Sequence, residues 1–251
     1  MTESAPWFFV PKLVGPGSRM EFDAREAQHA TSSRRLEVGQ ALVVFDGKGT
    51  HAPARLTSTG KRRVEIELGV HCTTPVSDPV VHLATALPKG DRLATLLGMA
   101  TQLGVASITA LECKRSVVRT RDEVPERWTR VLTEAAKQSR RSRLPDLEIG
   151  ASPAEFAQLW TPRGAKVLLL HPASDEPLDA PSTRSLGTTL SNLSWSSARA
   201  LIVGPEGGLT DDEVAECEAA GAVRVALGDG ILRIETAAVA SVSLARQIGC
   251  A

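Results

Sequence analysis

Two glycine-rich stretches near the carboxyl end have residue types that suit a ligand site. The first, Gly204-Pro205-Glu206-Gly207-Gly208-Leu209, follows the apolar run 200–203, which is short and branched enough for a buried strand. The second, Gly228-Asp229-Gly230, follows another apolar run at 223–227. Glycine lets backbone groups approach a flat ligand with no Cβ in the way, and ligands of open α/β sheets bind beyond the carboxyl ends of strands. Either loop alone could be an ordinary tight turn, but the pair predicts a site.

Each loop leads into a predicted helix. Thr210 with Glu213 three residues later is a capping box, so a helix should begin near Asp211, and Gly221 is placed to end it. A second helix should begin near Glu235-Thr236. The order strand, glycine loop, helix therefore occurs twice in succession.

These segments carry a family resemblance. The GPEGGL stretch and the later Ile231-Leu232-Arg233-Ile234-Glu235-Thr236-Ala237 resemble two signature segments of the RsmE family, SPOUT-class methyltransferases that modify N3 of a uridine in small-subunit (16S) ribosomal RNA. Ala86-Leu87-Pro88-Lys89-Gly90-Asp91 and residues 134–141 are also similar to family segments, so the resemblance covers most of residues 80–250. The chain departs from the family pattern at Gln102 and Lys137, where glutamate is usual.

The resemblance implies an α/β fold, in which a small PUA-like β-barrel domain precedes a SPOUT-type parallel sheet with a C-terminal trefoil knot. It implies S-adenosyl-L-methionine as cofactor, 16S rRNA of the small ribosomal subunit as partner, and a homodimer. The domains expected are 1–73 for RNA binding and 74–251 for methyl transfer. The residues expected to bind the cofactor are Leu170, His171, Val203, Gly204, Pro205, Glu206, Gly207, Gly208, Leu227, Gly228, Ile231, Leu232, Thr236 and Ala237.

Catalytic candidates follow from the chemistry of methyl transfer. The cofactor supplies an activated methyl group, so the protein must hold two reactants at near-attack distance and manage one proton. N3 of uridine becomes a nucleophile once its proton leaves, and Arg233 is the first choice to stabilise the negative charge that results. Glu206 or Glu235 could act as the base or fix the arginine, although Glu235 could also be only an acid in the first turn of a helix.

RNA contacts are expected from basic side chains, because phosphates position an RNA on its protein. Basic residues outnumber acidic ones in residues 1–146, whereas the reverse holds for 147–251, within a net charge of +0. The alternatives are a solvated face of a sheet for the early residues and favourable helix-dipole contacts for the later ones. The residues expected to bind RNA are Arg34, Arg35, Lys48, Lys89, Arg140, Arg141 and Arg143, with Lys61, Arg62 and Arg63 as further phosphate contacts.

The remaining elements must position these residues. Short strands at 7–10, 41–45, 50–58 and 62–68, with a helix at 24–33 and an Asp46-Gly47 hairpin turn, predict a small β domain. Beyond it, strands at 80–87, 105–111 and 166–170 alternate with helices, which predicts a parallel sheet. The helices are expected at 92–103, with Asp91 as its cap, and at 126–139, and residues 174–198 are predicted to form a mobile surface insertion.

The amino-acid composition limits the classes of protein to which this chain can belong. A hydrophobic content of 42% supports a folded core, and with 4% aromatic residues the chain has little material for a broad base-stacking platform. No apolar run approaches eighteen residues and no signal sequence is evident, so a cytoplasmic protein without membrane contact is expected. Cys72, Cys113, Cys217 and Cys250 are far apart, which predicts reduced thiols and no metal site.

Three functions are compatible with these sequence features. The preferred one is a 16S rRNA (uracil-N3)-methyltransferase that depends on S-adenosylmethionine. A second enzyme is a SPOUT ribose 2′-O-methyltransferase, which would also rely on an arginine. A third is a non-catalytic RNA-binding or ribosome-assembly factor that has kept the fold. The GPEGGL and ILRxETA segments together with a leading β domain favour the first.

Overall fold

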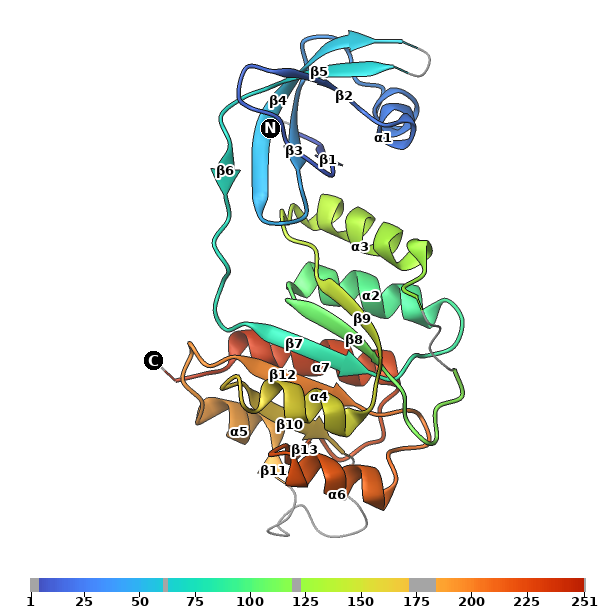
Figure 1. The fold of residues 1–251 in the computed structure, drawn as a ribbon, viewed down its shortest axis with the longest axis vertical. Coiled ribbons are helices and arrows are strands. Elements are labelled where there is room, and N and C mark those ends of the chain that lie inside the picture. The colour runs from blue at the N-terminus through green and yellow to red at the C-terminus, as the bar shows by residue number, and fades with distance from the viewer. Residues whose placement is uncertain (1–4, 61–62, 119–122, 172–183, 251) are drawn as a thin grey trace. The chain divides into compact units, whose positions relative to one another are not determined.

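A computed structural model describes residues 5–60, 63–118, 123–171 and 184–250 of the chain (Figure 1). The chain forms two compact units. Unit 1 consists of Met1–Val76 and Thr133–Leu144, and unit 2 consists of Ser77–Leu132 and Pro145–Ala251. The segment 133–144 therefore joins the N-terminal residues in unit 1, and the functional division at residues 73 and 74 stays a prediction.

Unit 1 is built on a six-stranded sheet with the order β1-β3-β4-β5-β2, in which β6 also pairs with β4. All pairs are antiparallel except β1 with β3. Alternating residues of β3 and β4, such as Leu42, Val44 and Leu56, are buried in one core with Phe8 and Phe22. The elements are β1 (Trp7–Phe9), β2 (Arg19–Glu21), α1 (Ala24–Gln28), the π-helix η1 (His29–Ser33), β3 (Ala41–Phe45), β4 (Thr50–Thr59), β5 (Val64–Leu68), β6 (Cys72–Thr73) and the second half of α3 (Glu126–Ser139).

Unit 2 contains a seven-stranded sheet with the order β11-β13-β10-β12-β7-β8-β9, and every pair in it is parallel. Helices cover both of its faces (Figure 1): α7 packs with α2 and α5, and α4 packs with α6. Besides the first half of α3, the elements are β7 (Val81–Thr85), α2 (Arg92–Leu103), β8 (Ser107–Leu111), β9 (Asp146–Ala151), α4 (Pro153–Trp160), β10 (Lys166–Leu170), β11 (Arg184–Ser185), α5 (Leu186–Ser191), β12 (Arg199–Val203), α6 (Asp211–Ala219), β13 (Val223–Ala226) and α7 (Ile234–Gln247).

The register of this sheet brings three strand ends together. Leu170 at the end of β10 pairs with Val203 of β12 on one side and with Val225 of β13 on the other. The chain segments that leave these strands therefore start at the same edge. The predicted parallel α/β sheet and the small N-terminal sheet are confirmed, whereas the threading of the chain into a trefoil knot stays a prediction.

Several local expectations differ from the structure. The helix expected at 24–33 is a short α-helix that continues as a π-helix, and Asp91 occupies the cap position of α2 without a capping hydrogen bond from its side chain. The insertion expected at 174–198 includes β11 and α5, where Leu186 and Leu190 are buried, while residues 174–183 lie outside the described residues. Those buried leucines explain why a stretch rich in serine and threonine is helical.

The structure also bears on disulfides, membrane-spanning helices and metal sites. All four cysteines are free thiols. Over the described ranges, no helix combines the length and apolar character that crossing a membrane requires, and no group of three or more potential metal ligands is found.

Candidate cofactor pocket and active site

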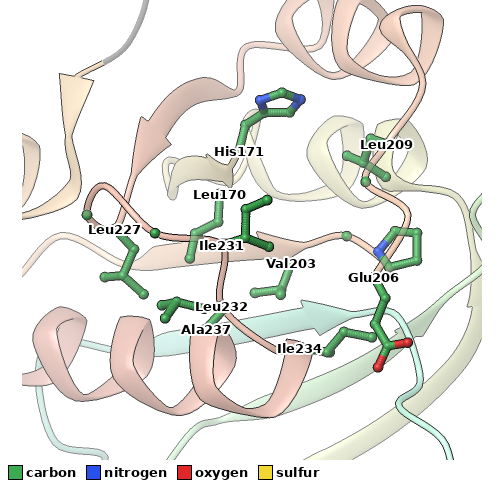
Figure 2. Close-up of a pocket in the computed structure, with 15 residues that line it drawn as sticks. Leu170, His171, Val203, Glu206, Leu209, Leu227, Ile231, Leu232, Ile234 and Ala237 are labelled. Atoms are coloured by element: carbon green, nitrogen blue, oxygen red, sulfur yellow. The ribbon is translucent and has the colours of Figure 1, made fainter. Parts of the chain in front are cut away.

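A pocket opens where β10, β12 and β13 end. It contains about 700 Å³ of empty space, part of it open to solvent, and mostly apolar side chains and glycines surround it (Figure 2). Apolar walls with a few polar groups are typical of small-molecule sites. The lining residues are Leu170, His171, Val203, Gly204, Pro205, Glu206, Gly208, Leu209, Leu227, Gly228, Gly230, Ile231, Leu232, Ile234 and Ala237.

The first glycine loop owes its shape to local chemistry. Gly208 has φ +70°, which glycine adopts without strain, and its N–H donates to the Pro205 carbonyl at 2.8 Å. A Cβ on Gly204 would lie 3.0 Å from the Leu209 side chain, so glycine also allows a close approach there. The capping box predicted at Thr210 is confirmed: its hydroxyl accepts from the N–H of Glu213, whose carboxylate accepts from the N–H of Thr210.

A neighbouring loop holds this glycine loop in place. Arg115, which follows β8, donates through its Nη1 to the carbonyl of Gly207 at 3.1 Å and to that of Leu209 at 3.4 Å. The N–H of Lys114 donates to the Glu213 carboxylate at 2.8 Å. Arg115 could not be identified from the sequence, because nothing near it in the chain indicates that its partners lie more than ninety residues away.

The second glycine loop supplies the apolar wall. Gly228 has φ +137°, a region that side chains disfavour. Ile231 and Leu232 are 86% and 42% exposed although both line the pocket. In Figure 2, Leu227 and Leu232 lie toward one end of the pocket and Glu206 lies toward the other. Exposed apolar side chains on the wall of a concave site favour an apolar ligand surface against them.

One guanidinium lies beside both candidate carboxylates. Nη1 of Arg92, in the first turn of α2, is 2.7 Å from Glu206 Oε1 and 3.8 Å from Glu235 Oε2. The Glu235 side chain is 15% exposed, and its Oε2 is buried without a hydrogen bond from any described residue. Arg92 was not among the expected site residues, although it directly follows the Lys89-Gly90-Asp91 turn that carries part of the resemblance.

Arg233 is placed differently from these groups. It occupies the N-cap position of α7 with extended backbone angles, between pocket residues Leu232 and Ile234, and it is exposed. Its side chain forms no hydrogen bond or ion pair with another residue in the described part of the chain. Since Arg92 is the cation beside Glu206 and Glu235, Arg233 is left available for a bound molecule.

Most of the residues expected to bind the cofactor come together in this pocket. Gly207 and Thr236 are the two that do not line it, while Leu209, Gly230 and Ile234 line it in addition. Gly207 instead presents its carbonyl to Arg115, and Thr236 is exposed on α7. The roles themselves stay predictions.

The expected RNA contacts are divided between the units. Lys89 is exposed in unit 2, in the turn before α2. Arg143 of unit 1 donates to the Thr74 carbonyl at 3.2 Å, and its guanidinium packs against Gly49, where a Cβ would clash. Lys61 and Arg62 lie outside the described residues. Arg63 pairs with Glu21 at 3.0 Å and with Glu65 at 3.4 Å. The other expected contacts in unit 1 are Arg34, Arg35, Lys48, Arg140 and Arg141.

The fold and the pocket define the class. Residues 76–246 match the model of an RNA methyltransferase domain, and residues 22–69 match that of an RNA methyltransferase PUA domain. The protein is therefore of the RNA methyltransferase class, with a PUA domain ahead of its methyltransferase domain. More particularly, the chain belongs to the ribosomal RNA small subunit methyltransferase E (RsmE) family.

Individual relatives agree with this assignment. The ribosomal RNA small subunit methyltransferase E of Mycobacterium tuberculosis is 32% identical over 238 residues, covering 92% of this chain and 87% of the relative. The structure of its Neisseria gonorrhoeae counterpart, bound to S-adenosylmethionine, has a TM-score of 0.79 at 28% identity and covers 96% of each chain. A Legionella pneumophila methyltransferase with the same cofactor has a TM-score of 0.80 at 27% identity, covering 98% of this chain and 99% of its own.

Proposed function

We propose that this protein uses S-adenosylmethionine to methylate N3 of a uridine in 16S rRNA. The observation that carries the proposal is the pocket between two glycine loops, with a pair of carboxylates held by Arg92 on one side. Arg233, which has no partner among the described residues, follows the pocket residue Leu232. Membership of the RsmE family and the cofactor bound in two similar structures support it. Such a substrate places the enzyme in the cytoplasm.

The pocket fits the cofactor. Leu227, Ile231 and Leu232 offer apolar surface for the adenine ring, and the backbone of the Gly204 and Gly228 loops offers polar groups that no side chain covers. When bound, the cofactor supplies an activated methyl group, which needs no further activation by the protein. The work left to this chain is to orient the uracil ring and to handle one proton.

Proton removal is assigned to the carboxylates. Glu206 lines the pocket and is 45% exposed, so it can accept a proton and release it to water. Glu235, in the first turn of α7, is less exposed, and one of its oxygens is buried without a hydrogen bond from any described residue. Arg233 binds the O2 or O4 side of the ring, where the negative charge collects after N3 loses its proton.

We assign RNA binding mainly to unit 1. The domain of residues 1–73 binds RNA through the phosphate contacts named above, and residues 74–251 carry out the transfer. Arg140, Arg141 and Arg143 lie in unit 1, which supports a role for them in RNA binding. We further propose that the enzyme acts as a homodimer.

Mass spectrometry of 16S rRNA nucleosides tests the proposal directly. Cells without the gene should lack one 3-methyluridine that cells with the gene contain, and the purified protein should restore it with S-adenosylmethionine. Loss of a 2′-O-methylated nucleoside instead would support the ribose methyltransferase. An unchanged nucleoside profile, together with no heat on titration of S-adenosylmethionine, would support a non-catalytic binding protein.

A further inference from the structure

A second pocket lies wholly within unit 1, and none of its residues has been given a role in the function proposed above. It contains about 460 Å³ of empty space, part of it open to solvent, and every residue around it is polar. We call it the α1 pocket. Its residues are Arg25, Glu26, Gln28, His29, Ser32, Ser33, Glu134 and Lys137.

The floor of the α1 pocket is a buried ion pair. Lys137 Nζ is 3.0 and 3.1 Å from the two carboxylate oxygens of Glu26 and 3.3 Å from Glu134. The Lys137 and Glu26 side chains are 6% and 5% exposed. Glu134 also pairs with Arg25 at 3.2 Å. The positive charges of Arg25 and Lys137 therefore cancel the negative charges of Glu26 and Glu134. The pocket is polar but carries no net charge, which makes it a poor site for a phosphate group.

The rim of the α1 pocket presents polar side chains that have no hydrogen-bond partner among the described residues. The side chains of Gln28, His29, Ser32 and Ser33 form no hydrogen bond with other residues in the described ranges. Burial and the Lys137 ammonium lower the pKa of His29, so its ring is neutral at pH 7 and has one donor and one acceptor nitrogen. The rim therefore presents both donors and acceptors around a neutral floor.

The backbone of this rim is unusual. His29–Ser33 is a π-helix, with the N–H of Arg34 bonded to the His29 carbonyl at 3.0 Å. Such turns are rare and occur often at functional sites. Arg34 and Arg35, two of the expected phosphate contacts, follow it directly in the chain, and Arg35 has φ +50°. A strand of RNA on these arginines would have its next base or sugar close to the rim.

We propose that the α1 pocket binds the base of an unpaired nucleotide of the RNA substrate. A nucleobase is planar and uncharged, and its edge carries both donors and acceptors, as the rim requires. The floor disfavours a phosphate because its two cations are already paired with carboxylates and offer the phosphate no net attraction. The proposal rests on RNA being the substrate, but it concerns recognition and not the transfer of the methyl group.

Fluorescence anisotropy with the full chain tests this proposal. The probes are fluorescein-labelled single-stranded RNA decamers of uridine, cytidine or adenosine, and a ribose-phosphate decamer without bases. Gln28→Ala with Ser33→Ala alters only exposed side chains, so the fold should persist, and Ser58→Ala on the exposed face of β4 is the matched control. His29→Gln provides a second, independent variant of the rim.

The double variant should bind at least one base-bearing decamer about tenfold more weakly, the loss expected for one or two hydrogen bonds. The loss should be the same at every salt concentration and absent with the abasic decamer. Arg34→Gln with Arg35→Gln should instead lower the slope of log K against log salt by about 1.4 for every decamer. Ser58→Ala should leave all affinities unchanged.

Three results would overturn the proposal: wild-type binding that is no stronger with bases than without, equal binding by the rim variants and wild type, or a rim variant that changes the salt slope. The function proposed above would survive each of them, because 3-methyluridine in rRNA is measured separately. Conversely, cells with and without the gene could contain the same amount of 3-methyluridine while the rim variants lose base-dependent binding. The proposal for the α1 pocket would then stand, and the proposed methyltransferase function would be rejected.

Discussion

Arg92 Nη1 lies 2.7 Å from Glu206 Oε1 although 114 residues separate them in the chain. The same nitrogen lies 3.8 Å from Glu235 Oε2. One guanidinium therefore connects the first turn of α2 with the first glycine loop and with the start of α7. Without it, the two carboxylates would lose the positive charge with which both of them pair.

Replacing Arg92 should disturb both carboxylates together. We expect Arg92→Gln to lower the rate of methyl transfer to rRNA by about a hundredfold, because misplacing a reacting group by about 1 Å has effects of that size. Arg92→Lys should recover part of the loss. The rate is measured with a tritiated methyl group at saturating and limiting rRNA, which separates kcat from KM.

A double-mutant cycle tests whether Arg92 acts on the reaction through Glu206. Arg92→Gln combined with Glu206→Gln should cost much less than the product of the two single losses, because both changes break one contact. Arg224→Gln breaks an exposed pair with Glu218, at 3.1 Å, outside the pocket and serves as the control. Independent, multiplicative losses would show that Arg92 does not act through Glu206.

Arg233→Ala should abolish methyl transfer while the affinity for S-adenosylmethionine stays within a few-fold of wild type. The side chain is exposed and has no partner among the described residues, so its removal breaks no contact that holds the fold. Calorimetry gives the affinity and the tritium assay gives the rate. Near-normal turnover would remove Arg233 from the mechanism.

Gly208→Ala should weaken cofactor binding through backbone strain alone. The residue has φ +70° and a Cβ there would meet no atom within 4 Å, so the cost is conformational, about 1–2 kcal/mol. We expect a roughly tenfold rise in Kd for S-adenosylmethionine by calorimetry. Gly98→Ala, within α2, is the matched control and should leave that Kd unchanged, because the added Cβ would lie 3.9 Å from the Val131 side chain, an ordinary contact distance. Equal affinities for the Gly208 variant and wild type would show that the loop tolerates a side chain.

His82 should make unit 2 less stable in acid. It is buried, stacks on Trp160 at 3.5 Å and hydrogen-bonds Ser107 at 2.8 Å, and burial followed by the Arg163 charge lowers its pKa to about 4. The folded state therefore prefers neutral histidine, whereas the unfolded chain takes up a proton below about pH 6.5. The free energy of unfolding should fall as the pH drops from about 6.5 to about 4, by roughly 2–3 kcal/mol.

Urea unfolding followed by tryptophan fluorescence measures this effect. His82→Gln should be less stable than wild type at pH 7 but should lose less stability on acidification. His51→Gln, a change in the other unit, should keep the wild-type pH dependence of unit 2. A His82 variant with the same pH dependence as wild type would assign the acid sensitivity to other groups.

Local chemistry explains what could be predicted along the chain. The capping box of Thr210 and Glu213 acts over three residues, and the positive φ of Gly208 and Gly228 is a property of single positions. Apolar runs such as 166–170 and 200–203 became β10 and β12, because a fully buried parallel strand needs little more than that pattern. The element β9, by contrast, alternates partly buried and exposed residues and was missed.

Contacts between distant segments explain what could not be predicted. The sequence by itself determined the two glycine loops, the helices that follow them and most of the pocket wall, since each depends on neighbours a few residues away. Only the tertiary structure decided that Arg92, and not Arg233, lies beside the carboxylates, that Arg115 holds the first loop, and that Lys137 is neutralised by Glu26, 111 residues away. Ion pairs of this kind depend on which strand ends and helix faces the fold brings together, and a charged side chain looks the same in the sequence whether its partner is water or a buried carboxylate.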